Sequence, residues 1–254
     1  KLGAGEEDAP TERVLELTEA THSFEFHGIE SRPVPSLLRH FSAPVRVRYS
    51  WSREQLLFLM SHDPDGFNRW DAGQRLAVDV IQSLVGAPDD AEIEPRLVEA
   101  YRKLISDTEL DQALVAKMLQ LPSEAYLIEL ADNADVPAIH RARDAVLRHL
   151  AGALKAELIA CYQRHQDGGP YEVTPVAIAR RSLRNTALAW LLMIDDQEGR
   201  ELAVSQLNAA DNMTDRMGAL RALVNSGFES DRQQALDEFC DRFKDDPQVV
   251  EQWF

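Results

Sequence analysis

The spacing of apolar residues changes at Trp51, and this change decides which fold classes are open to the chain. From there onward, apolar residues recur about every 3.6 residues, the period of an α-helix with one buried face. Pro, Gly, Ser and Asp separate the helical stretches, and no stretch is apolar all round. About ten helices joined by short links predict a mainly α fold, an irregular α-superhelix of stacked antiparallel helix pairs without a strict sequence repeat.

Capping residues predict where these helices begin. Ser52 and Gln55 have the spacing of a capping box, which predicts a helix that starts at Ser52. Asp135 is predicted to cap a single helix of about thirty residues. Thr214 is predicted to cap a later helix, and Ser230 to open the last one through a second capping-box spacing. The other expected helices cover approximately 67–84, 92–105, 111–120, 123–130, 175–191 and 198–209.

The first fifty residues have a different pattern. Val14–Leu17, Phe24–Phe26 and Val45–Tyr49 are short, and the last two alternate apolar and polar residues as half-buried strands do. Three prolines between the second and third segments predict a long connection with room for one helical turn. We therefore expect a small partial β-sandwich module at residues 1–50, holding its last strands, and an α-helical superhelical domain, truncated at its C-terminal end, at residues 51–254.

The charge of the chain argues against two classes of partner. Lys and Arg number 27 and Asp and Glu number 43, a formal net charge of −16 that repels nucleic-acid phosphates and anionic membranes. No run approaches the roughly 18 apolar residues of a membrane span, and the acidic N-terminus lacks the order of a signal peptide. Only Cys161 and Cys240 occur, without a CxxC pair. We expect no nucleic-acid or membrane partner and a cytoplasmic location.

The titratable residues form no complete catalytic or metal-binding motif. The seven histidines are His22, His27, His40, His62, His140, His149 and His165. They include no HxxxH pair, the spacing that brings two imidazoles on one helix to a zinc ion. His62 and Asp63 resemble the HD pair of metal phosphohydrolases, but we favour a polar turn because no second histidine and distal aspartate accompany them. Both cysteines are expected to be buried small apolar residues.

Two polar segments could bind a ligand. The first is a basic patch on one predicted helix, made of Arg180, Arg181, Arg184 and Asn185. It could bind a carboxylate, but salt bridges to neighbouring acidic helices are the favoured interpretation. The second segment contains Asn208, Asp211 and Asn212. Its oxygens lack the order of an EF-hand, so a loop with an N-cap is favoured. We expect no catalytic, metal-binding or substrate-binding residue in this chain.

Four long strings carry a family resemblance: PVPSLLRHFSAPVRVRYSWS, FNRWDAGQRLA, RRSLRNTALAWL and AADNMTDRMGALRALV. In this order they resemble bacterial aminopeptidase N, a zinc metallopeptidase of the gluzincin type, from about Thr21 to Phe254. The resemblance implies a fragment that covers the end of the β-sandwich domain and part of the C-terminal helical domain. The link from Gly86 to Glu94 is shorter than in many family members.

The resemblance also implies an activity for the parent protein. Family members remove N-terminal amino acids from peptides, hold zinc through HExxH and a downstream glutamate, and hold the substrate amine through GxMEN. Neither motif occurs in this chain. The resemblance therefore implies that this chain alone is inactive, that it needs no cofactor while the parent enzyme uses zinc, and that its partners are the missing catalytic domain and, in the parent, peptide substrates.

The implied role is to wall the active-site chamber and restrict the access of substrates. One alternative is a stand-alone helical-repeat scaffold that binds a basic or peptide partner, suggested by the net charge and the missing motifs. A third hypothesis is a metal-dependent phosphohydrolase that uses His62 and Asp63.

Overall fold

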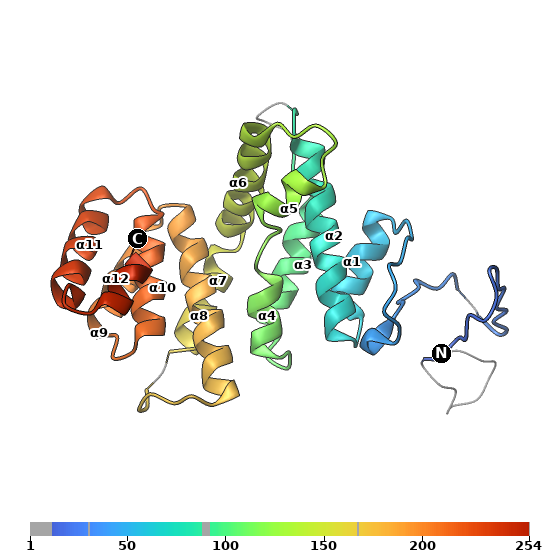
Figure 1. Ribbon diagram of the computed structural model, residues 1–254, viewed down its shortest axis with the longest axis horizontal. Helices are drawn as coiled ribbons and strands as arrows, with labels where there is room; N and C mark the ends of the chain where they lie inside the picture. The colour runs from blue at the N-terminus through green and yellow to red at the C-terminus, as the bar shows by residue number, and fades with distance from the viewer. Residues whose placement is uncertain (1–11, 30, 88–91, 167, 254) are drawn as a thin grey trace.

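A computed structural model describes residues 12–29, 31–87, 92–166 and 168–253. These residues form one 3-10 helix and twelve α-helices that lie side by side in an elongated row (Figure 1). In chain order they are η1 (Arg39–Phe41), α1 (Arg53–His62), α2 (Gly66–Leu84), α3 (Pro95–Ser106), α4 (Gln112–Met118), α5 (Glu124–Glu129), α6 (Val136–Ala153), α7 (Lys155–Arg164), α8 (Pro175–Met193), α9 (Gln197–Ala209), α10 (Met213–Val224), α11 (Glu229–Phe243) and α12 (Pro247–Trp253). The predicted mainly α fold is confirmed.

The caps of several helices follow directly from the sequence. The Ser52 hydroxyl accepts a hydrogen bond from the backbone N–H of Gln55, whose side chain accepts one from the backbone N–H of Ser52. This capping box is the predicted one. Asp135 caps α6, and Thr174 caps α8, which has Pro175 in its first turn. Each cap satisfies N–H groups that have no partner inside the helix.

Buried apolar side chains from α1 to α11 form one continuous core. Leu76 on α2, Leu150 on α6 and Leu188 on α8 are almost fully buried within it. The helix α8 is central, because it packs against α4, α6 and α7 and also against α9 and α10. The buried polar cluster around Arg184, described below, is built on this helix.

Three helix predictions are corrected by the structure. The predicted thirty-residue helix is broken at Leu154, which has φ −114° and ψ 14° between α6 and α7. The Ala153 carbonyl accepts a hydrogen bond from Arg102 of α3 at 3.2 Å, so the break is stabilised by packing against another helix. The cap of α10 is Asn212, not Thr214. The helix α11 starts after Phe228 without a side-chain cap, not at Ser230.

The N-terminal segment, residues 12–50, contains no strand among its described residues. The predicted strands at Val14–Leu17, Phe24–Phe26 and Val45–Tyr49 are therefore not formed in this structure. Most of their side chains are exposed, including Val14 at 82%. A strand needs a hydrogen-bonded neighbour and a packed face, and a complete β-sandwich of seven strands takes about 100 residues. The N-terminal segment is too short to provide both the neighbouring strands and the packed face.

A buried polar cluster between α8, α9 and α10

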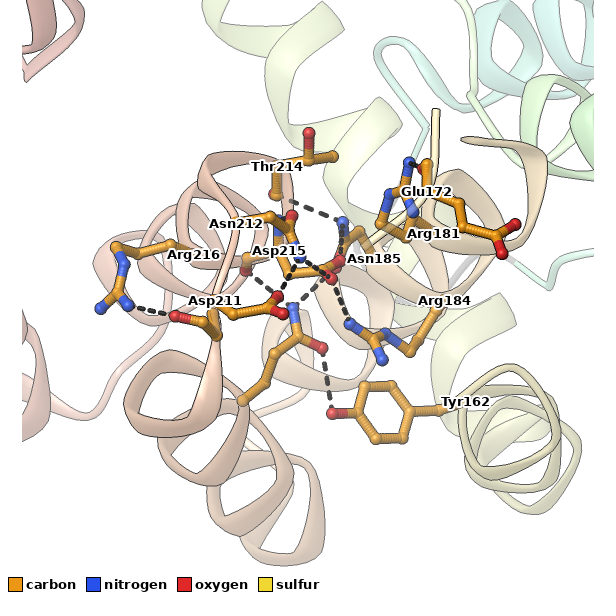
Figure 2. Close-up of polar contacts among 12 residues, drawn as sticks. Tyr162, Glu172, Arg181, Arg184, Asn185, Asp211, Asn212, Thr214, Asp215 and Arg216 are labelled. Carbon is orange, nitrogen blue, oxygen red and sulfur yellow. Dashed lines mark hydrogen bonds and ion pairs between the residues drawn. The ribbon is translucent and has the colours of Figure 1, made fainter. Parts of the chain in front are cut away.

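The cluster is built on an ion pair between two central helices. Arg184 of α8 contacts Asp215 of α10, with 2.8 Å between Nη2 and Oδ2, and both side chains are less than 10% exposed (Figure 2). Asp215 lies in the first turn of α10, where the helix dipole favours a carboxylate. The Asn212 side chain accepts from the backbone N–H of Asp215 and donates to its carboxylate, both at 2.9 Å. Asn212, the N-cap of α10, therefore also holds the Asp215 carboxylate in position for the ion pair.

Amide and hydroxyl groups extend the pair into a network. Asn185 donates to the Asp215 carboxylate at 3.3 Å, and its own oxygen accepts from Gln206 of α9 at 2.7 Å. The Tyr162 hydroxyl of α7 donates to the Gln206 side-chain oxygen at 3.0 Å. Burial raises the pKa of Tyr162, and the nearby Asp215 raises it further while Arg184 opposes the change. The network thus joins four helices through a phenol that stays protonated at neutral pH.

A small residue makes room for this network. Gly218 of α10 faces Asn185, and a Cβ atom at Gly218 would lie 2.5 Å from the Asn185 Cγ. That distance is far shorter than any van der Waals contact, so the side-chain amide of Asn185 occupies the space that a larger residue would need. Asn185 and Gly218 belong to two of the strings that carry the family resemblance.

The basic patch predicted on this helix is not one binding surface. Arg184 faces Asp215, as the favoured salt-bridge interpretation expects. Arg181 is 2% exposed, donates to the carbonyl of Glu172 at 2.8 Å and lies over the ring of Tyr171 at 4.7 Å. Figure 2 shows these two arginines with different partners. Arg184 joins α8 to α10, and Arg181 joins α8 to the loop that contains Glu172. Both guanidinium groups therefore have internal partners.

The remaining polar candidates are also placed by the structure. Asn212 is the N-cap of α10, as expected for its segment, while Asn208 and Asp211 are exposed. His62 is exposed and stacks on Phe58, whereas Asp63 is buried and accepts from the backbone N–H of Asp65 at 2.9 Å. The two residues lie at the α1–α2 turn, the predicted polar turn.

Metal-ligand groups do not converge in the part of the chain that the structure describes. There, no three His, Cys, Asp or Glu side chains are arranged to hold a metal ion. Cys161 is buried as expected, and burial raises its thiol pKa to about 11. Such a thiol is a poor nucleophile at neutral pH. Cys240 is only partly buried, which corrects the expectation for that residue.

His165 predicts a pH dependence of stability. Burial lowers its pKa below 6.5, and its Nδ1 lies 2.7 Å from the Cys161 carbonyl oxygen, which opposes this shift. Below about pH 6.5 the unfolded chain therefore binds the proton more readily than the folded chain, so stability falls as the pH decreases. Thermal unfolding between pH 7.5 and 5.5 measures this effect. We expect His165→Gln to lose less melting temperature over that range than the unsubstituted chain.

The exposed His149 provides the matched control for this experiment. His149→Gln is expected to keep the pH dependence of the unsubstituted chain. If His165→Gln and His149→Gln show the same dependence, the buried imidazole is not responsible for it.

A second polar cluster joins the N-terminal segment to α2. Asn68 donates to the Ser36 hydroxyl at 2.8 Å and to the Leu37 carbonyl at 2.9 Å. The Trp51 indole donates to the Pro35 carbonyl at 3.0 Å and lies under the Arg75 guanidinium. These residues come from the other two family strings. Sequence reasoning missed that the four strings form two contacting pairs, although polar residues inside apolar helical stretches are a signal for such contacts.

None of the helices in the described part of the chain is long and apolar enough to cross a membrane.

Family models match both parts of the sequence. Residues 53–254 match a family described as "Domain of unknown function (DUF3458_C) ARM repeats", and residues 2–50 match one described as "Domain of unknown function (DUF3458) Ig-like fold". The second match supports the expected β-sandwich module at the N-terminus.

Individual relatives are bacterial aminopeptidases. The chain is 36% identical to Aminopeptidase N of Escherichia coli, over 96% of this chain and 28% of the relative. It is 34% identical to Aminopeptidase N of Haemophilus influenzae, over 95% of this chain and 28% of the relative. A crystal structure of Legionella pneumophila aminopeptidase A in complex with aspartic acid matches with a TM-score of 0.78 and 31% identity, over 91% of this chain and 28% of that one. The resemblance expected from the four strings is confirmed, and the chain spans 28% of the length of these curated relatives.

Proposed function

Because the chain belongs to the DUF3458_C family of ARM-repeat domains and is homologous to part of bacterial aminopeptidase N, we propose that it is the non-catalytic helical part of a zinc-dependent aminopeptidase. In the parent enzyme, which removes N-terminal amino acids from peptides, this part walls the active-site chamber and restricts substrate access. The observation that carries the proposal is the match over 96% of this chain to 28% of a peptidase.

The packing of the helices supports the role of a wall. A wall that excludes folded substrates must be rigid. If its helices moved apart by a few ångströms, the chamber would admit larger substrates. The buried Arg184–Asp215 pair and its network resist sliding of α8 against α9 and α10, because any shift breaks several charge-assisted bonds at once. The partners in this proposal are the catalytic domain of the same polypeptide and peptide substrates, without nucleic acid or membrane.

The zinc ion of the proposed parent is not assigned to this chain. The described residues provide no group of His, Cys, Asp or Glu side chains that fits a metal ion. We therefore assign no catalytic step to these residues, and the chemistry belongs to sequence outside this chain. Both cysteines are free thiols, which supports a cytoplasmic location for the parent.

The coding DNA upstream of the codon for Lys1 tests the proposal. In-frame translation is expected to give GxMEN, then HExxH and a downstream glutamate. The encoded protein is expected to release N-terminal amino acids from short peptides and to spare folded proteins with equally accessible first residues. This chain alone, assayed as the control, should release none. An intervening start codon, or release by this chain alone, would contradict the proposal and favour the stand-alone scaffold.

A further inference from the structure

A groove of about 820 Å³ lies along one face of α2, with α4, α5 and the link between them on its other side. Its volume is in the range of roughly 300–1,000 Å³ typical of ligand sites. The groove is separate from the cluster around Arg184, and the residues of that cluster do not line it. The side chains that line it suggest what it binds.

The α2 side of the groove carries a regular row of side chains. Four residues in this row are spaced by four positions: Trp70, Gln74, Val78 and Gln82. Such residues follow one another at intervals of about 6 Å along a helix. In an extended peptide, alternate residues are about 6.6–6.8 Å apart. An extended peptide parallel to α2 would therefore meet an amide side chain at about every fourth residue along its own chain.

Glutamine side chains suit a peptide backbone. A carboxamide offers both a donor and an acceptor, as each peptide unit does. Gln74 donates to the Gln120 carbonyl at 2.8 Å across the groove, which fixes its position and leaves its oxygen to accept from a ligand. Tyr126 and Leu130 on the opposite side are 46% and 44% exposed and offer apolar contacts to side chains of a ligand.

The charges of the groove favour an acidic ligand. Its two carboxylates are neutralised within the chain, since Asp71 pairs with Arg75 at 2.6 Å and Asp79 with Arg53 at 2.5 Å. Lys117 donates to the Gln120 side chain at 3.2 Å and forms no ion pair with the residues that the structure describes. Because Lys117 is exposed, its ammonium group is available to pair with a ligand carboxylate.

We propose that this groove binds an extended peptide ligand whose acidic side chain pairs with Lys117. The inference rests on the proposed function only for the class of ligand, because peptides are what the parent is proposed to act on. The groove then adds a binding site for peptides outside the catalytic part and favours acidic sequences among them.

Binding to this 254-residue chain tests the inference. The probe is a fluorescein-labelled, acetylated and amidated hexapeptide with leucine at alternate positions and one central glutamate, compared with the same peptide carrying lysine. Fluorescence anisotropy is expected to show about two- to fivefold tighter binding of the glutamate peptide, the effect of one exposed ion pair. Lys117→Glu should reverse this preference, and Tyr126→Ala should weaken the binding of both peptides.

Lys103 on α3 is the matched control, because it is exposed and lies outside the groove. Lys103→Glu should leave the preference unchanged, and circular dichroism checks that each variant is folded. Absence of saturable binding up to millimolar peptide overturns the inference. An equal effect of Lys103→Glu and Lys117→Glu also overturns it, because both substitutions change the net charge of the chain equally and the preference would then not depend on Lys117. Either outcome leaves the peptidase proposal intact, since the upstream motifs test that proposal independently.

Discussion

Asp215→Ala is expected to lower the free energy of unfolding by about 3–5 kcal/mol, as removal of one partner from a buried ion pair typically does. The substitution leaves the Arg184 guanidinium buried without its carboxylate partner, with the Tyr162 ring centroid 5.8 Å away. It also removes the carboxylate that accepts from Asn185 and Asn212. Urea unfolding followed by circular dichroism at 222 nm measures the loss as a lower midpoint with little change in slope.

Two further variants separate this effect from a general effect of charge. Asp71→Ala removes an acid from the more exposed pair with Arg75 and should cost less than about 1 kcal/mol. The double variant Arg184→Met with Asp215→Leu removes both charges and should be more stable than Asp215→Ala. Equal losses for Asp215→Ala and Asp71→Ala would show that burial of the pair has no energetic consequence.

Gly218→Ala is expected to destabilise the chain by about 1–3 kcal/mol, the usual cost of overpacking. Helix propensity alone predicts the opposite sign, because alanine is favoured over glycine inside a helix by about 1 kcal/mol. The contact decides the outcome, since the new methyl group would lie 2.5 Å from the Asn185 Cγ and would displace the amide from Gln206 and Asp215. The same urea titration measures the change.

Gly152 in α6 is the matched control, because a Cβ atom there would meet nothing within 4 Å. Gly152→Ala should stabilise the chain by up to about 1 kcal/mol through helix propensity. Combining Asn185→Ala with Gly218→Ala should give a smaller loss than the sum of the two single losses, because the shortened side chain removes the clash. A stabilising effect of Gly218→Ala would mean that the helices separate easily at this contact.

Much of the helical architecture could be predicted because the signals for it are local. A capping box needs only residues three positions apart, so Ser52 and Gln55 predicted the start of α1 correctly. The break at Leu154 could not be predicted, because the apolar stripe continues through α6 and α7 and the Leu154 side chain is itself fully buried. Packing of α6 against α2, α5 and α8, and of α7 against α3 and α8, decides where the helix ends.

The sequence predicted the type of interaction in the candidate site but not the partner of each residue. The sequence favoured salt bridges for Arg184 but did not identify Asp215, which lies 31 positions later. Likewise, no local signal connects Asn185 to Gly218, because a glycine that accommodates a side chain has the same appearance in a sequence as one that ends a helix. Two of the three N-terminal strands, Phe24–Phe26 and Val45–Tyr49, were predicted from alternation, and alternation does not say whether a hydrogen-bonded neighbour is present.

The central position of α8 has a consequence for the order in which the helices unfold. In a simple solenoid each repeat touches only its neighbours, so unfolding can spread inward from either end. Here α8 contacts α4, from which three helices separate it along the chain, as well as α9 and α10. Loss of α8 removes support from both halves of the row together. Amide hydrogen exchange should therefore be slowest in α8 and similar in α4 and α10, and the middle of the array should open as one cooperative unit.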